Sequence, residues 1–135
     1  WISAGLALFG TLGAVYLFSF DPAKAIYASA SNLKTISPHM VDCLRMLVPP
    51  YLGLSILPIA SLMSKKNAAR FYISLVLCIV FCGNVTLESL WLISGRWNKN
   101  LLFYMAGDIS ITISQFFLAI RYFKRMRIDK AMKNE

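Results

Sequence analysis

Four long apolar stretches constrain this sequence more than any other feature. They cover about residues 2–20, 39–63, 69–94 and 101–123 of the 135-residue chain. A transmembrane helix needs about 20 apolar residues, because the hydrocarbon core is about 30 Å thick and each helical residue rises about 1.5 Å. Helices also satisfy their own backbone polar groups, which lipid cannot do. The sequence therefore predicts a single all-α domain, an integral membrane four-helix bundle with both termini on the same side.

The composition supports a membrane protein and not a nucleic-acid-binding one. The chain is 58% hydrophobic and only 15% charged, with a formal net charge of +8. A soluble domain has about a quarter of its residues charged. The basic residues lie at the ends of the apolar stretches, so we interpret them as determinants of topology and contacts to anionic lipids. Because the sequence begins at Trp1, we expect either a removed targeting segment or a numbering that starts inside a longer chain.

The distribution of lysine and arginine predicts the orientation. Nine basic residues would share the side of the termini: Lys65, Lys66, Arg70, Arg121, Lys124, Arg125, Arg127, Lys130 and Lys133. The opposite side would carry Lys24, Lys34, Arg96 and Lys99. The positive-inside rule then places both termini in the cytoplasm of a bacterial plasma membrane, or in the matrix or stroma of an organelle inner or thylakoid membrane. The basic tail, residues 124–135, is predicted to attract anionic lipid, with docking to an acidic partner as the alternative.

Local patterns predict how the spans begin and pack. Small residues recur at helical spacing on one face of the first span, where another helix of the same chain could approach closely; homodimerisation is the alternative. These residues are Ala7, Gly10, Gly13 and Ala14. Pro38 suits the first turn of the second span, and Pro49-Pro50 predicts a kink within that span. Residues 23–30 could form a short interfacial helix.

Polar residues inside the spans are the candidate functional site, since ionisable groups in lipid are costly and often functional. They are Arg45, Asn84, Glu88, Asp108, Thr112 and Gln115. Glu88 precedes Gly95 by seven residues and Asp108 follows Leu101 by seven. Both carboxylates are therefore expected about 10 Å below the same surface. Arg45, about five residues into the second span, enters from that side, so we expect one cluster of two carboxylates and one guanidinium.

Three interpretations of this cluster stay open. It could be an internal network that fixes helix register, a pocket for a lipid headgroup, quinone or pigment, or a site of proton or ion translocation. Catalysis has little support, because the sequence contains no evident nucleophile pair or phosphate-binding loop. Three cysteines and one histidine, His39, do not provide the ligand spacing of a structural zinc site. We therefore expect no enzyme activity and no metal.

Short motifs resemble those of a known family. The first span ends in Phe20-Asp21-Pro22, the second opens with Asp42 and Arg45, and Gly53 follows. The third span carries Asn84 and Glu88 before a glycine-basic turn, and Asp108 follows in the fourth. In these features the chain is similar to small four-span membrane domains of unknown function, whose broader relatives include the DoxX-like proteins. The resemblance implies a four-helix membrane bundle and no established activity.

Two functions follow as expectations. The first is a non-catalytic accessory subunit of a larger respiratory or photosynthetic complex, in contact with other integral membrane subunits and with lipid or pigment. A mass of 15.2 kDa leaves almost nothing outside the membrane to bear chemistry. The alternative is a stand-alone transporter, binding protein or membrane enzyme that uses Arg45, Glu88 and Asp108.

Overall fold

The computed structural model describes residues 1–21, 37–94 and 99–132, and every regular element in these ranges is an α-helix. The helices are α1 (Ile2–Phe20), α3 (Pro38–Met46), α4 (Val48–Met63), α5 (Asn67–Ile93) and α6 (Lys99–Ala131). Four helical segments are long and apolar enough to cross a membrane: Ile2–Phe20, Val41–Met63, Asn67–Leu90 and Leu102–Ala131. The predicted all-α, four-span membrane bundle is confirmed. The predicted interfacial helix at residues 23–30 lies outside the described residues.

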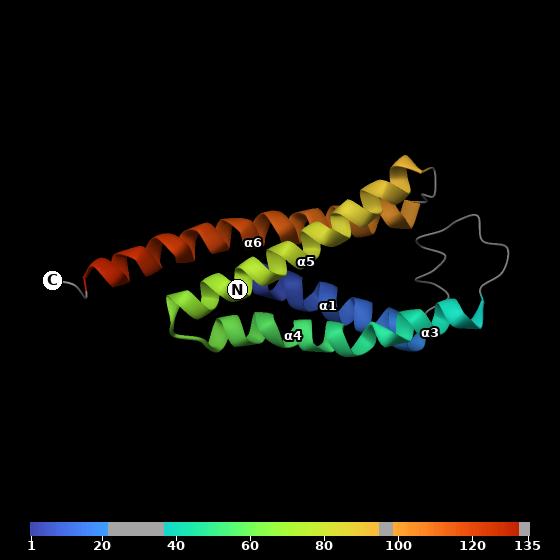
Figure 1. Ribbon diagram of the computed structural model, residues 1–135, viewed down its shortest axis with the longest axis horizontal. Coiled ribbons are helices and arrows are strands. Elements are labelled where there is room, and N and C mark those ends of the chain that lie inside the picture. The colour runs from blue at the N-terminus through green and yellow to red at the C-terminus, as the bar shows by residue number, and fades with distance from the viewer. Residues whose placement is uncertain (22–36, 95–98, 133–135) are drawn as a thin grey trace.

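The helices form two antiparallel pairs. α5 packs mainly against α6, and α1 packs mainly against α4, with successive spans alternating in direction (Figure 1). The pairs meet through a small core of Ala7, Leu77, Phe81 and Ile111. They diverge toward the end of the molecule where α5 terminates (Figure 1). Groups placed between the pairs at that end are therefore contributed by both halves of the bundle.

The second span is broken where the proline pair predicts a kink. α3 ends at Met46, α4 begins at Val48, and Pro49 and Pro50 lie in the first turn of α4. Proline suits a first turn because the missing N–H has no partner there. The amide of Leu47 donates to the carbonyl oxygen of Leu44, three residues earlier, at 3.0 Å. A bond between residues three apart tightens the last turn of α3. The predicted start of this span at Pro38 is also confirmed.

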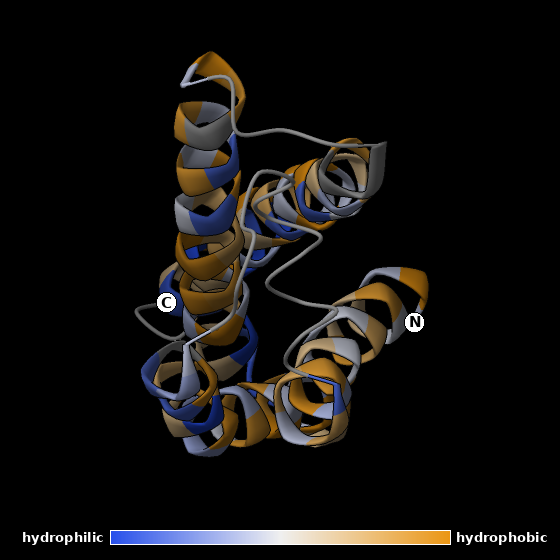
Figure 2. Ribbon diagram, turned by 90° about the vertical axis from the view of Figure 1, so that its right-hand side faces the viewer, coloured by the Kyte–Doolittle hydropathy of each residue, from blue (hydrophilic) through white to orange (hydrophobic). Residues whose placement is uncertain are grey.

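The small-residue face of α1 packs within the chain. Ala7 is fully buried, and a Cβ atom added to Gly10 would lie 3.0 Å from Cδ1 of Ile111. A Cβ atom on Gly13 would meet nothing within 4 Å, so the close contact covers only part of the predicted face. Large apolar side chains such as Phe9, Ile79 and Phe117 are exposed, as lipid-facing side chains are. Figure 2 shows mostly hydrophobic ribbons interrupted by short hydrophilic segments.

Candidate functional site

An intramembrane acidic centre lies where α4, α5 and α6 meet. We define it by Tyr51 of α4, Asn84 and Glu88 of α5, and Asp108 of α6. The Tyr51 hydroxyl donates a hydrogen bond to Oδ1 of Asn84, with the two atoms 3.4 Å apart. The Asn84 side chain also lies near the carboxyl group of Asp108. Asn84 thus lies between a phenol, to which it is hydrogen-bonded, and a carboxyl group.

Glu88 is the unusual member of the centre. Only 8% of the residue is exposed, and its Oε2 atom is buried with no hydrogen-bond partner among the described residues. Asn84 precedes Glu88 by four residues, one helical turn, so the two side chains share a face of α5. A buried polar atom without a partner loses its hydration and gains nothing in return, which costs about 1–3 kcal/mol. Such an atom calls for an explanation.

The two carboxyl groups, Glu88 on α5 and Asp108 on α6, are close enough to interact electrostatically. Within the described ranges, neither carboxyl group forms an ion pair with a lysine or arginine. Arg45, the expected partner, lies instead 3.9 Å from Asp42 one turn earlier on α3, measured from Nη1 to Oδ1. Both of those side chains are exposed, at 59% and 64%. The centre therefore contains two carboxyl groups and not the predicted guanidinium.

Thr112 and Gln115 share the helical face of Asp108 but do not join the acidic centre. The Thr112 hydroxyl donates to the carbonyl oxygen of Asp108 at 2.8 Å, a bond within α6. Gln115, only 2% exposed, donates from Nε2 to the hydroxyl and to the carbonyl oxygen of Ser3, at 3.0 and 3.2 Å. Ser3 in turn donates to the hydroxyl of Ser114 at 2.9 Å. The expected polar face thus divides into an acidic centre and a neutral cluster that joins α1 to α6.

The basic tail continues α6 as an exposed helix. Lys124, Arg125, Arg127 and Lys130 are all exposed. α6 contains 33 residues, about 50 Å of helix, and so exceeds the roughly 30 Å hydrocarbon core. Arg127 lies over the ring of Phe123, with its Cζ 5.7 Å from the centroid.

Sequence reasoning missed Tyr51 as a member of the acidic centre. A tyrosine directly after the proline pair carries a hydroxyl into an otherwise apolar span, and a buried tyrosine hydroxyl usually has a partner. The position of Tyr51 in an apolar span was therefore the sequence feature that could have identified it as a member of the acidic centre. No group of three histidine, cysteine or acidic side chains suited to a metal ion occurs in the part of the chain that the structure describes.

Comparisons with known proteins find no relative of this chain, so the acidic centre is the main evidence on function. A scan against protein-family models finds no match, and searches of curated proteins and of solved structures find none either.

Proposed function

We propose that this chain is a small, non-catalytic integral membrane protein that binds a protonated amine or a similar hydrogen-bond-donating ligand at the acidic centre. The observation that carries the proposal is the buried, unpartnered Oε2 atom of Glu88 beside the Asp108 carboxyl group. A ligand that donates hydrogen bonds and carries positive charge would give the unpartnered oxygen a donor and balance the charge of the two carboxyl groups.

The energetics favour a ligand over a purely structural role. A register-fixing network satisfies its members, since a partly satisfied buried network is less favourable than an apolar core. Here the Asn84 oxygen accepts a hydrogen bond from Tyr51, whereas Glu88 keeps one oxygen without a partner among the described residues. An ionisable side chain inside a membrane span is retained chiefly where it pairs, becomes hydrated or binds something.

The neighbouring groups have distinct roles in the proposed site. Glu88 and Asp108 accept hydrogen bonds from the ligand and balance its charge. Asn84 holds the Asp108 carboxyl group in place, and Tyr51 fixes the orientation of the Asn84 amide by donating to its oxygen. Because α4 belongs to one helix pair and α5 and α6 to the other, a bound ligand would stabilise the packing of the two pairs against each other.

A binding measurement with benzylammonium tests the proposal. The purified chain, reconstituted in lipid nanodiscs, is titrated calorimetrically with benzylammonium and with phenylacetate, which has a similar size and the opposite charge. We expect saturable binding of the cation only. Glu88→Gln should weaken this binding by about tenfold or more, since a charge-assisted bond contributes about 1.5–3 kcal/mol.

Asp42→Asn is the matched control, because it removes one carboxylate at an exposed position on α3. The proposal predicts unchanged benzylammonium binding in this variant. Equal losses in Glu88→Gln and Asp42→Asn would indicate general charge attraction and contradict a defined site. Saturable binding of phenylacetate with the same affinity would also contradict it.

An accessory-subunit role is the second candidate, favoured by the exposed helical extension of α6. Its cations Lys124, Arg125 and Lys130 project past the span and are available to an acidic partner. Mild-detergent extraction followed by native electrophoresis tests this role. Migration with a large complex supports it, whereas migration as a monomer or small oligomer contradicts it. In the accessory role, Glu88→Gln should leave the complex intact.

A further inference from the structure

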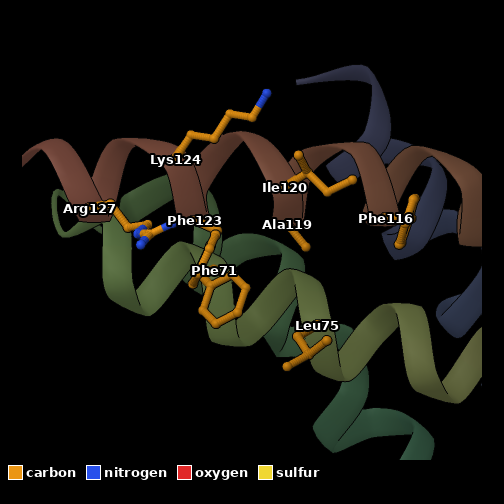
Figure 3. A pocket seen from close by; sticks show the side chains of 8 residues that line it. All are labelled: Phe71, Leu75, Phe116, Ala119, Ile120, Phe123, Lys124 and Arg127. Atoms are coloured by element: carbon orange, nitrogen blue, oxygen red, sulfur yellow. The ribbon is translucent and has the colours of Figure 1, made fainter.

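We propose that a groove between α5 and α6 binds one anionic phospholipid, at the end of the bundle opposite the acidic centre. The groove has a volume of about 440 Å³. Phe71 and Leu75 line it from α5, and Phe116, Ala119, Ile120 and Phe123 line it from α6 (Figure 3). This inference is independent of the proposed function, since it involves none of the acidic-centre residues.

The groove has the chemistry that an acyl chain requires. Six of its eight lining residues are apolar, and the rings of Phe71 and Phe123 pack at a tilt of 44° with their centroids 5.5 Å apart. Phe116 and Phe123 are 53% and 41% exposed, so lipid has access to their rings. A hydrocarbon chain seated here makes close contacts with aromatic and branched side chains, and such packing is what drives association within lipid.

The length of the groove matches one leaflet of a bilayer. Phe116 and Arg127 are the outermost lining residues on α6 and lie eleven residues apart. That separation is about 16 Å along the helix axis, roughly half of the 30 Å hydrocarbon core. Arg127 therefore lies at the level of the headgroup when the apolar residues lie at the level of the acyl chain.

Positive charge is concentrated at the headgroup end. Lys124 and Arg127 are the charged lining residues, and the lining contains no acidic side chain. Figure 3 shows the Arg127 side chain extending toward α5 beside Phe123, and the Lys124 side chain extending away from α5. Arg127 is thus placed to contact the phosphate, and Lys124 supports it from the outer face of α6. A guanidinium binds phosphate oxygens through its fork of N–H donors.

Two other charged groups near the groove, Arg70 and Asp129, have internal partners. Arg70 donates from Nε to the carbonyl oxygen of Ser64 at 2.7 Å and lies over the Tyr122 ring. Asp129 accepts a hydrogen bond from Nδ2 of Asn67 at 2.8 Å. Among the described residues, Arg127 and Lys124 form no ion pair, and so their charges are available to a lipid phosphate. An anionic lipid fits this arrangement better than a neutral one or a purely apolar helix.

Native mass spectrometry of the full chain tests the proposal. The protein, in detergent, is titrated with phosphatidylglycerol and with phosphatidylcholine of the same acyl chains. We expect one phosphatidylglycerol to be retained preferentially. The double variant Lys124→Gln, Arg127→Gln should lose this preference, by roughly fivefold for each cation removed.

Arg121→Gln with Arg125→Gln is the matched control, because it removes the same charge from exposed positions of α6 that do not line the groove. This variant should retain the preference. Equal losses in the two double variants would overturn the proposal in favour of diffuse attraction to the tail, as would a wild-type protein with no preference.

Leu75→Trp tests the acyl-chain part of the site without changing charge. Leu75 is 38% exposed on the groove wall, and so a larger ring can fill the space without disturbing the core. We expect retention of phosphatidylglycerol to fall to the level of phosphatidylcholine. Unchanged retention would place the lipid elsewhere and overturn the proposal. A wild-type dimer that Leu75→Trp dissociates would also overturn it, because the occupant would then be a second copy.

Discussion

At the scale of single residues, Glu88 shows how a functional requirement can conflict with stability. Its carboxyl group is buried with one oxygen unpartnered among the described residues, whereas the nearby Asn84 accepts a hydrogen bond from Tyr51. A ligand that partners the free oxygen would remove this cost only when bound. The unliganded protein should therefore gain stability when the carboxyl group is replaced.

Glu88→Gln is expected to raise the free energy of unfolding of the unliganded protein by about 1 kcal/mol. The amide keeps the size of the side chain, carries no charge, and can donate to the Asp108 carboxyl group. Thermal unfolding in detergent, followed by circular dichroism, measures the change. Asp42→Asn, at an exposed position, should leave the midpoint unchanged. A lower midpoint for Glu88→Gln would assign the carboxylate to a satisfied structural network.

Gln115→Leu is expected to destabilise the fold by about 0.5–2 kcal/mol, the range for hydrogen bonds between membrane helices. The buried Gln115 side chain donates twice to Ser3 and so holds α1 against α6. Unfolding in mixed detergent and SDS micelles measures the loss. Ser110→Ala is the control, since the Ser110 hydroxyl donates to the Ala106 carbonyl oxygen of its own helix and bonds no other described residue. Equal effects of the two substitutions would contradict an interhelical role for Gln115.

The sequence allowed the polar residues to be identified, but only some of their partners. Helical spacing placed Asn84 with Glu88 on one face, and the short turn to α6 brought Asp108 near. Arg45 was misassigned because a nearby carboxylate competes for it: Asp42, one turn away, pairs with it at the exposed end of the span. The partner of Gln115 lies 112 residues away, and no local pattern encodes such a contact.

At the scale of helices, sequence reasoning was most reliable. The first predicted span, residues 2–20, coincides with α1, and the proline pair marks the break between α3 and α4. Both features depend on local physics: apolar length for a span, and the missing N–H of proline for the break. The face by which a helix packs depends on its neighbours, so the small-residue face of α1 was predicted as a whole and is in close contact only in part.

Gly10 and Gly13 form a matched pair that tests this packing. Gly10→Ala is expected to destabilise the protein by about 1 kcal/mol, because its Cβ would press on Ile111 in an already filled core. Gly13→Ala should be neutral or stabilising by about 0.5 kcal/mol, since its Cβ meets nothing within 4 Å and alanine suits a helix better. Unfolding in mixed micelles compares them. Greater destabilisation by Gly13→Ala would place the tight contact on another part of α1.

At the scale of the whole molecule, two chemically different ends emerge. The acidic centre lies toward the end where the helix pairs diverge, and the basic residues of α6 gather at the other. The alternation of successive spans follows from each one crossing back, as the sequence predicts. The division into an α1–α4 pair and an α5–α6 pair does not, because several pairings of four antiparallel helices satisfy the same apolar pattern.

Orientation in the membrane is the prediction that relates both ends to function. Lys65, Lys66 and Arg70 share the end of α4 and start of α5 with the basic tail, so the positive-inside rule predicts that this end faces the cytoplasm, matrix or stroma. In that orientation the lipid groove faces the leaflet whose anionic lipids attract Arg127, and the acidic centre faces the opposite compartment. The two proposed sites would then serve different sides of one membrane.

Cysteine labelling of intact cells tests this orientation. Cys43 is exposed at the third residue of the second span, Val41–Met63, whereas Cys78 and Cys82 lie deeper within the third span, Asn67–Leu90, and are replaced by alanine for the experiment. A membrane-impermeant maleimide added outside should label Cys43 before permeabilisation. Met132→Cys, in a chain that also carries Cys43→Ala, should react only afterwards. Position 132 follows the basic turns of α6, which the predicted orientation places on the inner side of the membrane. The reverse pattern would place the tail outside, so that Arg127 would meet the outer leaflet and the acidic centre would draw its ligand from the cytoplasm.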